Sequence, residues 1–298
     1  MKIAICVCFS KKNKSYHQKF LNSLNKINIP TYCSLTIYII INNNLENSKN
    51  LISKIINNHK LKIKILKTSK KDIPSTRNVF LNKIRNKKVK FIGFLDDDCN
   101  IGRNWIASMT KFIIKYNCDI VGGPQLHETT IHKYEIFYDF LEPKYKNKQS
   151  INWIATNNCF FKKEVINKKN CKFDERLKNI GGSDQLFFKR LKIGGKSIMW
   201  NINARVVEYY QKDRENIDWF LKRNFRYGFS GLTIDQSVFG KKIGYFINSL
   251  KIIYLLVLSI WELSKIFKAY NFFKSCFYLC RATGRIFAMT KFSMKNYH

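Results

Sequence analysis

Three consecutive aspartates in the stretch FIGFLDDDCN, Asp96, Asp97 and Asp98, are the residues with the most evident chemical potential. Adjacent carboxylates repel one another, so burying them is costly unless a cation lies close by. In an extended segment alternate side chains share a face, which puts Asp96 and Asp98 on one side. Carboxylate oxygens suit Mg²⁺ or Mn²⁺, which bind through one or two carboxylates together with substrate phosphates. The triplet predicts such a site, or else a solvated acidic turn before a helix that starts near Asn104.

A further carboxylate, Asp184, follows the glycine pair Gly181 and Gly182 in the stretch GGSDQLFFKRLKIGG. Glycines permit a sharp turn, after which Ser183 and Asp184 stand at the start of an expected helix. Such a turn can hold a carboxylate in a cleft, where it takes a proton from a reacting hydroxyl group. An aspartate that only caps its helix is the alternative interpretation.

Basic residues gather in the segment QKDRENIDWFLKRNFRYG, residues 211–228, which is expected to be helical. Lys222 and Arg226 are four residues apart and share a helical face, as do Trp219 and Arg223. Guanidinium groups fit phosphate oxygens, so this helix could compensate the charge of a departing diphosphate. A solvated basic helix is the alternative.

Short apolar runs predict the strands that must position these groups in the first 120 residues; the runs span 3–9, 35–41, 62–66 and 91–95. Between them, apolar residues recur every three or four positions, as in amphipathic helices, over 15–27, 47–59 and 75–86. This alternation predicts an α/β fold with a mostly parallel central sheet flanked by helices. Ligands bind at the carboxyl ends of the strands in such sheets, and the three aspartates stand at one such end.

The pattern is looser after residue 118. Residues 119–126 predict a short strand with a glycine turn, residues 153–166 a strand leading into a helix, and residues 196–200 a further strand. Residues 127–150 show no clear periodicity and are expected to form a variable excursion that covers the ligand crevice.

Residues 1 to about 230 resemble the family-2 glycosyltransferases of GT-A fold, most closely the bacterial exopolysaccharide branch of succinoglycan type. The resemblance rests on several pieces in order: IAICVCFS, IPSTRNVFL, FLDDDCN followed by Trp105, VGGP, TNNCFFKKEV, GGSDQLFFKRLKIGG and WFLKRNFRYG. It implies a nucleotide-sugar-binding part over 1–120, an acceptor part over 121–230 and a helical extension over 231–298.

The resemblance also implies roles for the carboxylates. Asp96 and Asp98 match the DXD aspartates, which contact the ribose and hold the divalent cation that bridges the diphosphate. Asp97 is grouped with the donor-binding residues and is expected to be solvated or hydrogen-bonded to backbone. Asp184 matches the general base that acts on the acceptor hydroxyl group in inverting members.

Further donor-binding residues follow from the same resemblance. Arg77 and Asn78 fall where the family lines the nucleotide pocket, and Arg223 and Arg226 match a basic segment near the leaving diphosphate. The chain departs from the family pattern at two places.

The second strand of the family typically ends in an Asp that reads the base, whereas Asn42, Asn43 and Asn44 stand here. Asparagine also hydrogen-bonds a base edge, so Asn42 and Asn44 are assigned to the donor. The residue before the general base is usually Glu, and here it is Ser183.

These assignments predict transfer of a sugar from a nucleotide-sugar donor, a UDP-sugar being favoured, to a saccharide or lipid-linked acceptor in surface polysaccharide synthesis. The predicted cofactor is Mn²⁺ or Mg²⁺, and the predicted reaction inverts the anomeric centre. A catalytically silent relative that binds nucleotide or glycan as a partner subunit is the alternative, suggested by Asn42 and Ser183.

The net charge of +34 indicates anionic partners such as nucleic acid, an anionic membrane surface or phosphorylated small molecules. Lys, Asn and Ile are abundant along the whole chain, so the charge need not mark a single basic surface. The aromatic and basic modules of nucleic-acid-binding proteins are not evident, and no nucleic-acid partner is expected.

The nine cysteines show no paired CxxC motifs for zinc, and buried reduced thiols in a cytoplasmic protein are expected. The opening run IAICVCF has the length of a strand and precedes a basic loop, so no export signal is predicted.

The C-terminal extension changes character. The run IIYLLVLSIW, residues 252–261, is uncharged but too short to cross a bilayer unless Lys251 is included. The aromatic and basic residues that follow are typical of helices that lie in a membrane interface. Peripheral contact with the anionic inner face of the cell membrane is one prediction, and packing against the catalytic domain is the other.

Overall fold

The computed structural model describes residues 1–9, 14–41, 45–128, 135–167, 171–209, 214–265 and 268–290. The chain divides into two compact units. The first comprises Met1–Glu128, Lys144–Phe173 and Phe187–Tyr209, and the second comprises Thr129–Pro143, Asp174–Leu186 and Tyr210–His298. Residue 230 lies inside a helix of the second unit, and the functional division at that residue stays a prediction.

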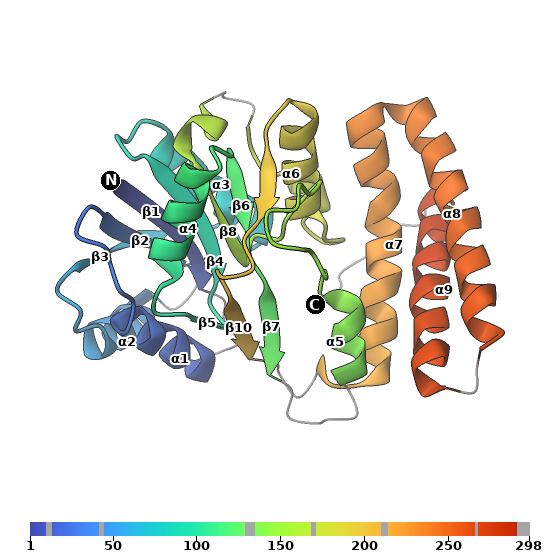
Figure 1. The fold of residues 1–298 in the computed structure, drawn as a ribbon, viewed down its shortest axis with the longest axis horizontal. Helices are drawn as coiled ribbons and strands as arrows, with labels where there is room; N and C mark the ends of the chain where they lie inside the picture. The colour runs from blue at the N-terminus through green and yellow to red at the C-terminus, as the bar shows by residue number, and fades with distance from the viewer. Residues whose placement is uncertain are drawn as a thin grey trace. The chain divides into compact units, whose positions relative to one another are not determined.

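In the described part of the first unit, seven strands form one sheet. Their spatial order is β3 (Leu61–Lys67), β2 (Ser34–Ile41), β1 (Lys2–Phe9), β4 (Phe91–Asp96), β8 (Asn158–Lys162), β6 (Ile120–Gly122) and β9 (Ile198–Trp200) (Figure 1). Within this set only β8 runs against its neighbours, so the sheet is mostly parallel, as predicted.

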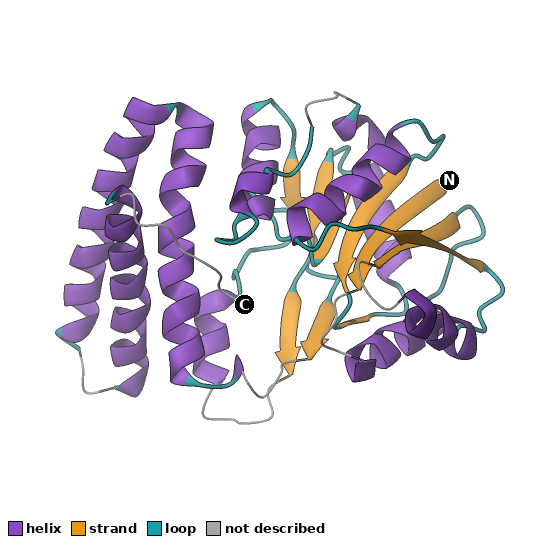
Figure 2. Ribbon diagram, turned by 180° about the vertical axis from the view of Figure 1, so that it is seen from behind, coloured by secondary structure: helices purple, strands orange, loops and turns teal. Residues whose placement is uncertain are grey.

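Alternating residues of β1 show how helices come to cover both faces of this sheet. Ile3, Ile5 and Val7 belong to one buried cluster, whereas Ala4 and Cys6 belong to another. The first cluster includes residues of α1 (Lys14–Asn25), α2 (Leu45–Ile55) and α4 (Trp105–Lys115), and the second includes residues of α3 (Ile73–Arg85). A strand with both faces buried must be almost wholly apolar, which explains the sequence IAICVCF. Figure 2 shows these strands and helices from behind.

A small sheet stands beside the main one in the first unit. It consists of β5 (Cys99–Ile101), β10 (Val206–Tyr209) and β7 (Gln125–Glu128), in that spatial order. β5 starts directly after the three aspartates, so these residues form the link between the two sheets. The strand predicted over 119–126 is thus two strands, β6 and β7, separated by the glycine turn.

The described part of the second unit is helical: α5 (Glu135–Leu141), the short 3₁₀ turn η3 (Glu175–Leu177), α7 (Ile217–Phe239), α8 (Lys241–Leu263) and α9 (Ala269–Met289). α7, α8 and α9 lie side by side (Figures 1 and 2). α6 (Ser183–Ile193) begins in this unit, and the division falls after Leu186.

Two regions differ in detail from their predictions. Residues 127–150, expected as an excursion without clear periodicity, contain the end of β7 and the helix α5, and their covering of the ligand crevice stays a prediction. The helix expected after β8 is the short 3₁₀ turn η2 (Lys163–Ile166).

Candidate active site

The aspartate triplet lies at the carboxyl end of an interior strand. β4 runs between β1 and β8 and ends at Asp96, and Asp97 and Asp98 then form a tight turn into β5. Asp96 pairs in register with Cys8 near the end of β1, so two parallel strands end together here. Ligands of open α/β sheets bind at such strand ends.

Arg77 provides a fixed positive charge beside the turn. Its Nη2 donates to Asp96 Oδ1 at 3.3 Å, and its guanidinium lies over the Phe173 ring at 5.7 Å. The Arg77 side chain is 10% exposed and that of Asp96 is 40% exposed. Arg77 lies in the first two turns of α3, whose start is fixed by Asp72, which accepts from Ser75 N at 2.9 Å. The predicted pocket residue and the predicted cation ligand therefore meet in the structure.

Asp97 is buried and is held by a side chain that sequence reasoning missed. His17 Nε2 lies 2.7 Å from Asp97 Oδ2, and both side chains are nearly inaccessible to solvent. The His17 ring stacks on Phe9 with 4.1 Å between centroids, which fixes the orientation of the imidazole. The expectation of a solvated Asp97 was therefore wrong, and the alternative of a hydrogen bond to backbone stays a prediction. An imidazole provides a better-directed donor than water does to a buried carboxylate.

Several carboxylates lie close to Cys99, the first residue of the strand β5 that follows the turn. Burial raises the pKa of the Cys99 thiol well above its usual range, and the carboxylates of Asp98, Glu208 and Asp96 raise it further. Asp98 is itself buried, and its carbonyl oxygen accepts from Tyr209 N at 3.2 Å, which ties the turn to β10. A local negative potential of this kind attracts a cation.

The residues at the turn fit a divalent cation that is shared with a substrate. Asp96 and Asp98 offer hard oxygen donors of the type that Mg²⁺ and Mn²⁺ prefer. Among the residues that the structure describes, no three His, Cys, Asp or Glu side chains gather as an all-protein metal site would require. A cation bound through one or two carboxylates and the phosphates of a nucleotide needs no such group.

The Asn78 side chain binds the backbone of Phe173 through both ends of its amide group. Its Nδ2 donates to the Phe173 carbonyl at 3.0 Å, and its Oδ1 accepts from Phe173 N at 2.8 Å. Both backbone groups of one residue are thereby tied to α3, next to the ring that faces Arg77. The Asn78 side chain thus holds Phe173 in place, so that the Phe173 ring lies next to the Arg77 guanidinium. Direct contact of Asn78 with a donor stays a prediction.

Three sequence pieces that carried the family resemblance meet at one buried amide. Asn158 Oδ1 accepts from Trp105 Nε1 at 2.8 Å, and Asn158 Nδ2 donates to the carbonyls of Pro124 and Ala204. A Cβ on Gly123 would come within 2.2 Å of the Ala204 carbonyl oxygen, so only glycine fits there. These motif residues hold β8 and the chain around β6 together.

Asp184 stands in the first turn of α6, in the second unit. Its Oδ1 accepts from Gln185 N at 2.8 Å and its side chain is half-buried. The preceding Gly181 and Gly182 both have φ of +81°, a conformation that side-chain-bearing residues rarely adopt. The predicted glycine turn and helix start are therefore confirmed, and the catalytic role stays a prediction.

The glycine turn packs against α7. A Cβ added to Gly181 would lie 3.6 Å from Arg226 Nε, and one added to Gly182 would lie 2.9 Å from Ile234 Cδ1 and 3.2 Å from Ser230 Oγ. α7 thus brings Arg226 beside the turn that precedes Asp184. A side chain at Gly182 would therefore force Ile234 and Ser230 to shift.

Replacing Gly182 by Ala is expected to destabilise the protein by about 2–5 kcal/mol. About 1–2 kcal/mol comes from the left-handed backbone and the rest from overpacking against Ile234 and Ser230. Gly195 provides a matched control, because its φ is +83° and a Cβ there would meet nothing within 4 Å. Urea unfolding of both alanine variants separates the two contributions, and equal losses would show that Ile234 and Ser230 yield without cost.

Arg223 lies between two aromatic rings of its own helix. Its guanidinium carbon is 4.9 Å from the Trp219 ring centroid and 5.3 Å from that of Tyr227. The spacing of four residues predicted from the sequence is confirmed by these contacts. The rings restrict the guanidinium, and its use in binding a diphosphate stays a prediction.

The predicted site residues thus form two sets. Asp96, Asp97, Asp98, Arg77 and Asn78 gather in the first unit. Asp184, Arg223 and Arg226 belong to the second unit, and Asn42 and Asn44 lie outside the described residues.

Comparison with known proteins agrees with this architecture. Residues 3–165 match the family model described as glycosyl transferase family 2. The structure is similar to that of residues 1–349 of S. aureus TarS solved with UDP-GlcNAc, with a TM-score of 0.57 and 13% sequence identity over 95% of this chain and 90% of that one. The same protein solved with UDP gives a TM-score of 0.56 and 14% identity over 99% and 93%.

At these identities the similarity to TarS shows the fold alone, which is of GT-A type. Comparison with curated proteins gives no match. The narrower resemblance to the succinoglycan-type branch stays a prediction.

Proposed function

Because this chain belongs to glycosyl transferase family 2, we propose that it transfers a sugar from a nucleotide-sugar donor to a saccharide or lipid-linked acceptor. The observation that carries the proposal is the acidic turn at the end of β4. There, Asp96 contacts the buried Arg77, and Asp96 and Asp98 lie near the further negative charge of Glu208, at the edge where this type of sheet binds ligands. The chain is a glycosyltransferase, and the turn is its proposed donor site.

On the donor side, Asp96 and Asp98 would hold Mn²⁺ or Mg²⁺, since enzymes of this family often use divalent metals. When bound, such a cation stabilises the charge that develops on a departing diphosphate. Asp96 also contacts the ribose, and Arg77 keeps the Asp96 carboxylate in place. Asp97, fixed by His17, shapes the turn from its buried side.

A UDP-sugar is the favoured donor. The similarly folded TarS was solved with UDP-GlcNAc and with UDP, which supports a uridine nucleotide without deciding the sugar. Asn42 and Asn44 are assigned to the base, and Asn78 to the nucleotide pocket through its hold on Phe173.

On the acceptor side, Asp184 acts as general base. Its carboxylate takes the proton of the acceptor hydroxyl group as that oxygen bonds to the anomeric carbon. The bond between the anomeric carbon and the diphosphate oxygen breaks with its electron pair on the diphosphate. Attack from the opposite side inverts the anomeric centre. Arg223 and Arg226 compensate the charge of the released diphosphate.

We assign the reaction to bacterial surface polysaccharide synthesis, in the cytoplasm at the inner face of the membrane. Functionally, residues 1–120 form the nucleotide-sugar-binding part, 121–230 the acceptor part and 231–298 a helical extension.

Incubating the purified chain with a panel of nucleotide-sugars and Mn²⁺ tests the proposal. Release of one nucleoside diphosphate above the rate without protein is expected, because water can take the place of the acceptor hydroxyl group. Rates equal to the blank with every donor, and with saccharide acceptors added, would overturn the proposal and favour the catalytically silent alternative.

Replacing His17 by Ala is expected to raise the donor KM about tenfold with a smaller effect on kcat. The reason is that His17 positions the acidic turn through Asp97 and does not touch the reacting atoms. His17→Gln keeps a donor group near Asp97 Oδ2 and should recover part of the loss. A double-mutant cycle with Asp97→Asn measures the coupling, and additive effects of the two changes on KM would contradict this role.

A further inference from the structure

α8 has an inverted distribution of polar and apolar residues. Its buried positions are Gly244, Asn248, Ser259 and Glu262, which carry no apolar side chain. Its exposed positions from residue 243 to residue 261 are large and apolar: Ile243, Phe246, Leu250, Ile253, Tyr254, Val257, Ile260 and Trp261, from 51% to 67% accessible. In water, burial of apolar side chains drives helix packing, so this arrangement does not suit an aqueous surface.

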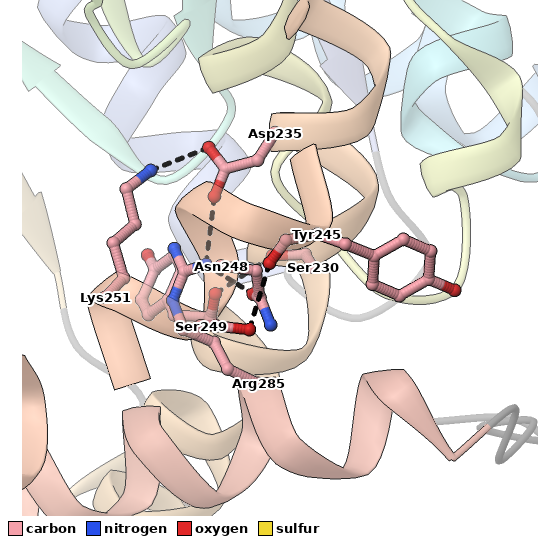
Figure 3. A network of polar contacts seen from close by, with 8 residues as sticks. Ser230, Asp235, Tyr245, Asn248, Ser249, Lys251 and Arg285 are labelled. Carbon is pink, nitrogen blue, oxygen red and sulfur yellow. Dashed lines mark hydrogen bonds and ion pairs between the residues drawn. The ribbon is translucent and has the colours of Figure 1, made fainter. Parts of the chain in front are cut away.

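Charged and polar groups hold the buried side of α8, that is, the side with Gly244, Asn248, Ser259 and Glu262, against the neighbouring helices (Figure 3). Asp235 of α7 is 1% exposed and lies 2.7 Å from Lys251 Nζ and 3.0 Å from Arg285 Nη1. Arg285 Nη1 also donates to Asn248 Oδ1 at 2.7 Å, so residues of α7, α8 and α9 share one network. Lys251, which interrupts the apolar sequence of α8, is therefore neutralised by a buried carboxylate while its own side chain stays 37% exposed.

A second set of polar contacts joins the C-terminal half of α8 to α9. Glu262 of α8 lies 2.7 Å from Lys274 Nζ of α9, and Ser259 Oγ lies 2.8 Å from Ser275 Oγ. Small residues let the helices approach closely: a Cβ on Gly228 would lie 2.1 Å from the Arg281 carbonyl oxygen, and one on Gly284 would lie 2.1 Å from the Phe225 carbonyl oxygen. Interhelical hydrogen bonds and small-residue contacts are the means by which helices associate where the surroundings are apolar.

The charge of this region complements an anionic surface. From Gln236 to the C-terminus the sequence has ten Lys and Arg residues and a single acidic residue, Glu262, which is buried against Lys274. Lys241 and Lys242 are exposed at the start of α8, and Lys265 Nζ lies 4.1 Å from the Trp261 ring centroid at its end. Cations and a tryptophan at the ends of an apolar helix are typical of membrane-interface segments.

We propose that the exposed apolar face of α8 docks into the interface of a phospholipid bilayer that contains anionic lipids, with the flanking lysines at the headgroups. By length and composition α8 could cross a membrane. It is, however, packed against α7, whose Lys222 is 52% exposed and, together with the charged end of that helix, would be drawn toward the hydrocarbon. A helix lying in the interface keeps these charges in water. The inference does not depend on the proposed transfer reaction.

Flotation of the full chain with vesicles tests this proposal. We expect binding to phosphatidylcholine vesicles with about one-third phosphatidylglycerol, and weaker binding to phosphatidylcholine alone. Changing Phe246, Ile253 and Trp261 together to Ser should weaken binding at least tenfold. The matched control changes three comparably exposed residues of the first unit, Ile73, Ile114 and Ile193, to Ser and should bind as wild type does.

The outcomes show whether the exposed apolar face of α8 binds a lipid bilayer or a second copy of the chain. Unchanged far-ultraviolet circular dichroism and unfolding midpoint in both triple variants would show that any loss is not caused by misfolding. If the wild type does not float with either vesicle, or if both triple variants lose binding equally, the proposal is wrong. If light scattering shows a wild-type dimer that the α8 variant converts to monomer, with no flotation, the face binds a second copy and the proposal is also wrong. Nucleotide binding, measured separately, is expected to be the same in all three proteins.

Discussion

Asp184→Asn is expected to lower kcat for sugar transfer by about 10²–10⁴-fold with little change in the donor Kd, because a carboxamide cannot take the acceptor proton. The substitution is nearly isosteric. The amide oxygen can still accept the hydrogen bond from Gln185 N, so the start of α6 should be preserved. Single-turnover transfer to acceptor and equilibrium binding of the nucleotide separate the two quantities.

A matched control distinguishes loss of a base from loss of a helix-terminal charge. Asp218 also lies in the first turn of a helix, α7, where it is exposed and forms an ion pair with Lys222. Asp218→Asn removes the same charge from an equivalent helical position and should leave kcat within about twofold of wild type. If Asp184→Asn transferred sugar at the wild-type rate, the base would lie elsewhere.

Asp98→Asn is expected to reduce kcat/KM for the donor by at least about 10²-fold, through loss of a cation ligand. The variant should nevertheless unfold at the same temperature as wild type or higher in the absence of ligands. Asp98 is buried next to other carboxylates, so neutralising it removes repulsion. Loss of function without loss of stability separates a binding carboxylate from a structural one.

Glu164→Gln provides the comparison for this second prediction. Glu164 is an exposed carboxylate of the first unit, in the turn after β8, and its replacement should change neither donor use nor stability. The variants should be assayed over a range of Mn²⁺ concentrations. If Asp98→Asn retained the wild-type kcat/KM and its Mn²⁺ dependence, the assignment of the acidic turn would be wrong.

The sheet could be predicted because its strands are buried on both faces. Such strands read as continuous apolar runs, and β1, β2 and β4 therefore stand out from the amphipathic helices between them. The turn at Asp96–Asp98 followed from the same reasoning, because three charges at the end of an apolar run mark a strand end.

The partners of these groups could not be predicted, because they come from distant parts of the chain. His17 and Asp97 are separated by 80 residues, and a single histidine in an amphipathic helix gives no signal of its partner. Likewise, the bonds of Asn158 to Trp105, Pro124 and Ala204 depend on tertiary packing.

α5 was missed for a different reason. It has seven residues, too few for a helical period to show, and its Phe137 packs on Phe220 of α7 in an apolar cluster. A helix of that length is stabilised by tertiary contacts more than by its own sequence. The inverted face of α8 was likewise hidden, because only the structure shows which of its residues are buried.

Thermal unfolding with a panel of nucleoside diphosphates, each with and without Mn²⁺, tests most directly whether the acidic turn is the donor site. For wild type and Asp184→Asn we expect a Mn²⁺-dependent rise in Tm with one nucleotide, about 5 °C at roughly 100 times Kd. For Asp98→Asn we expect no such rise. An equal rise in Asp98→Asn, or no rise in wild type with any nucleotide, would contradict the assignment of the donor site to the acidic turn.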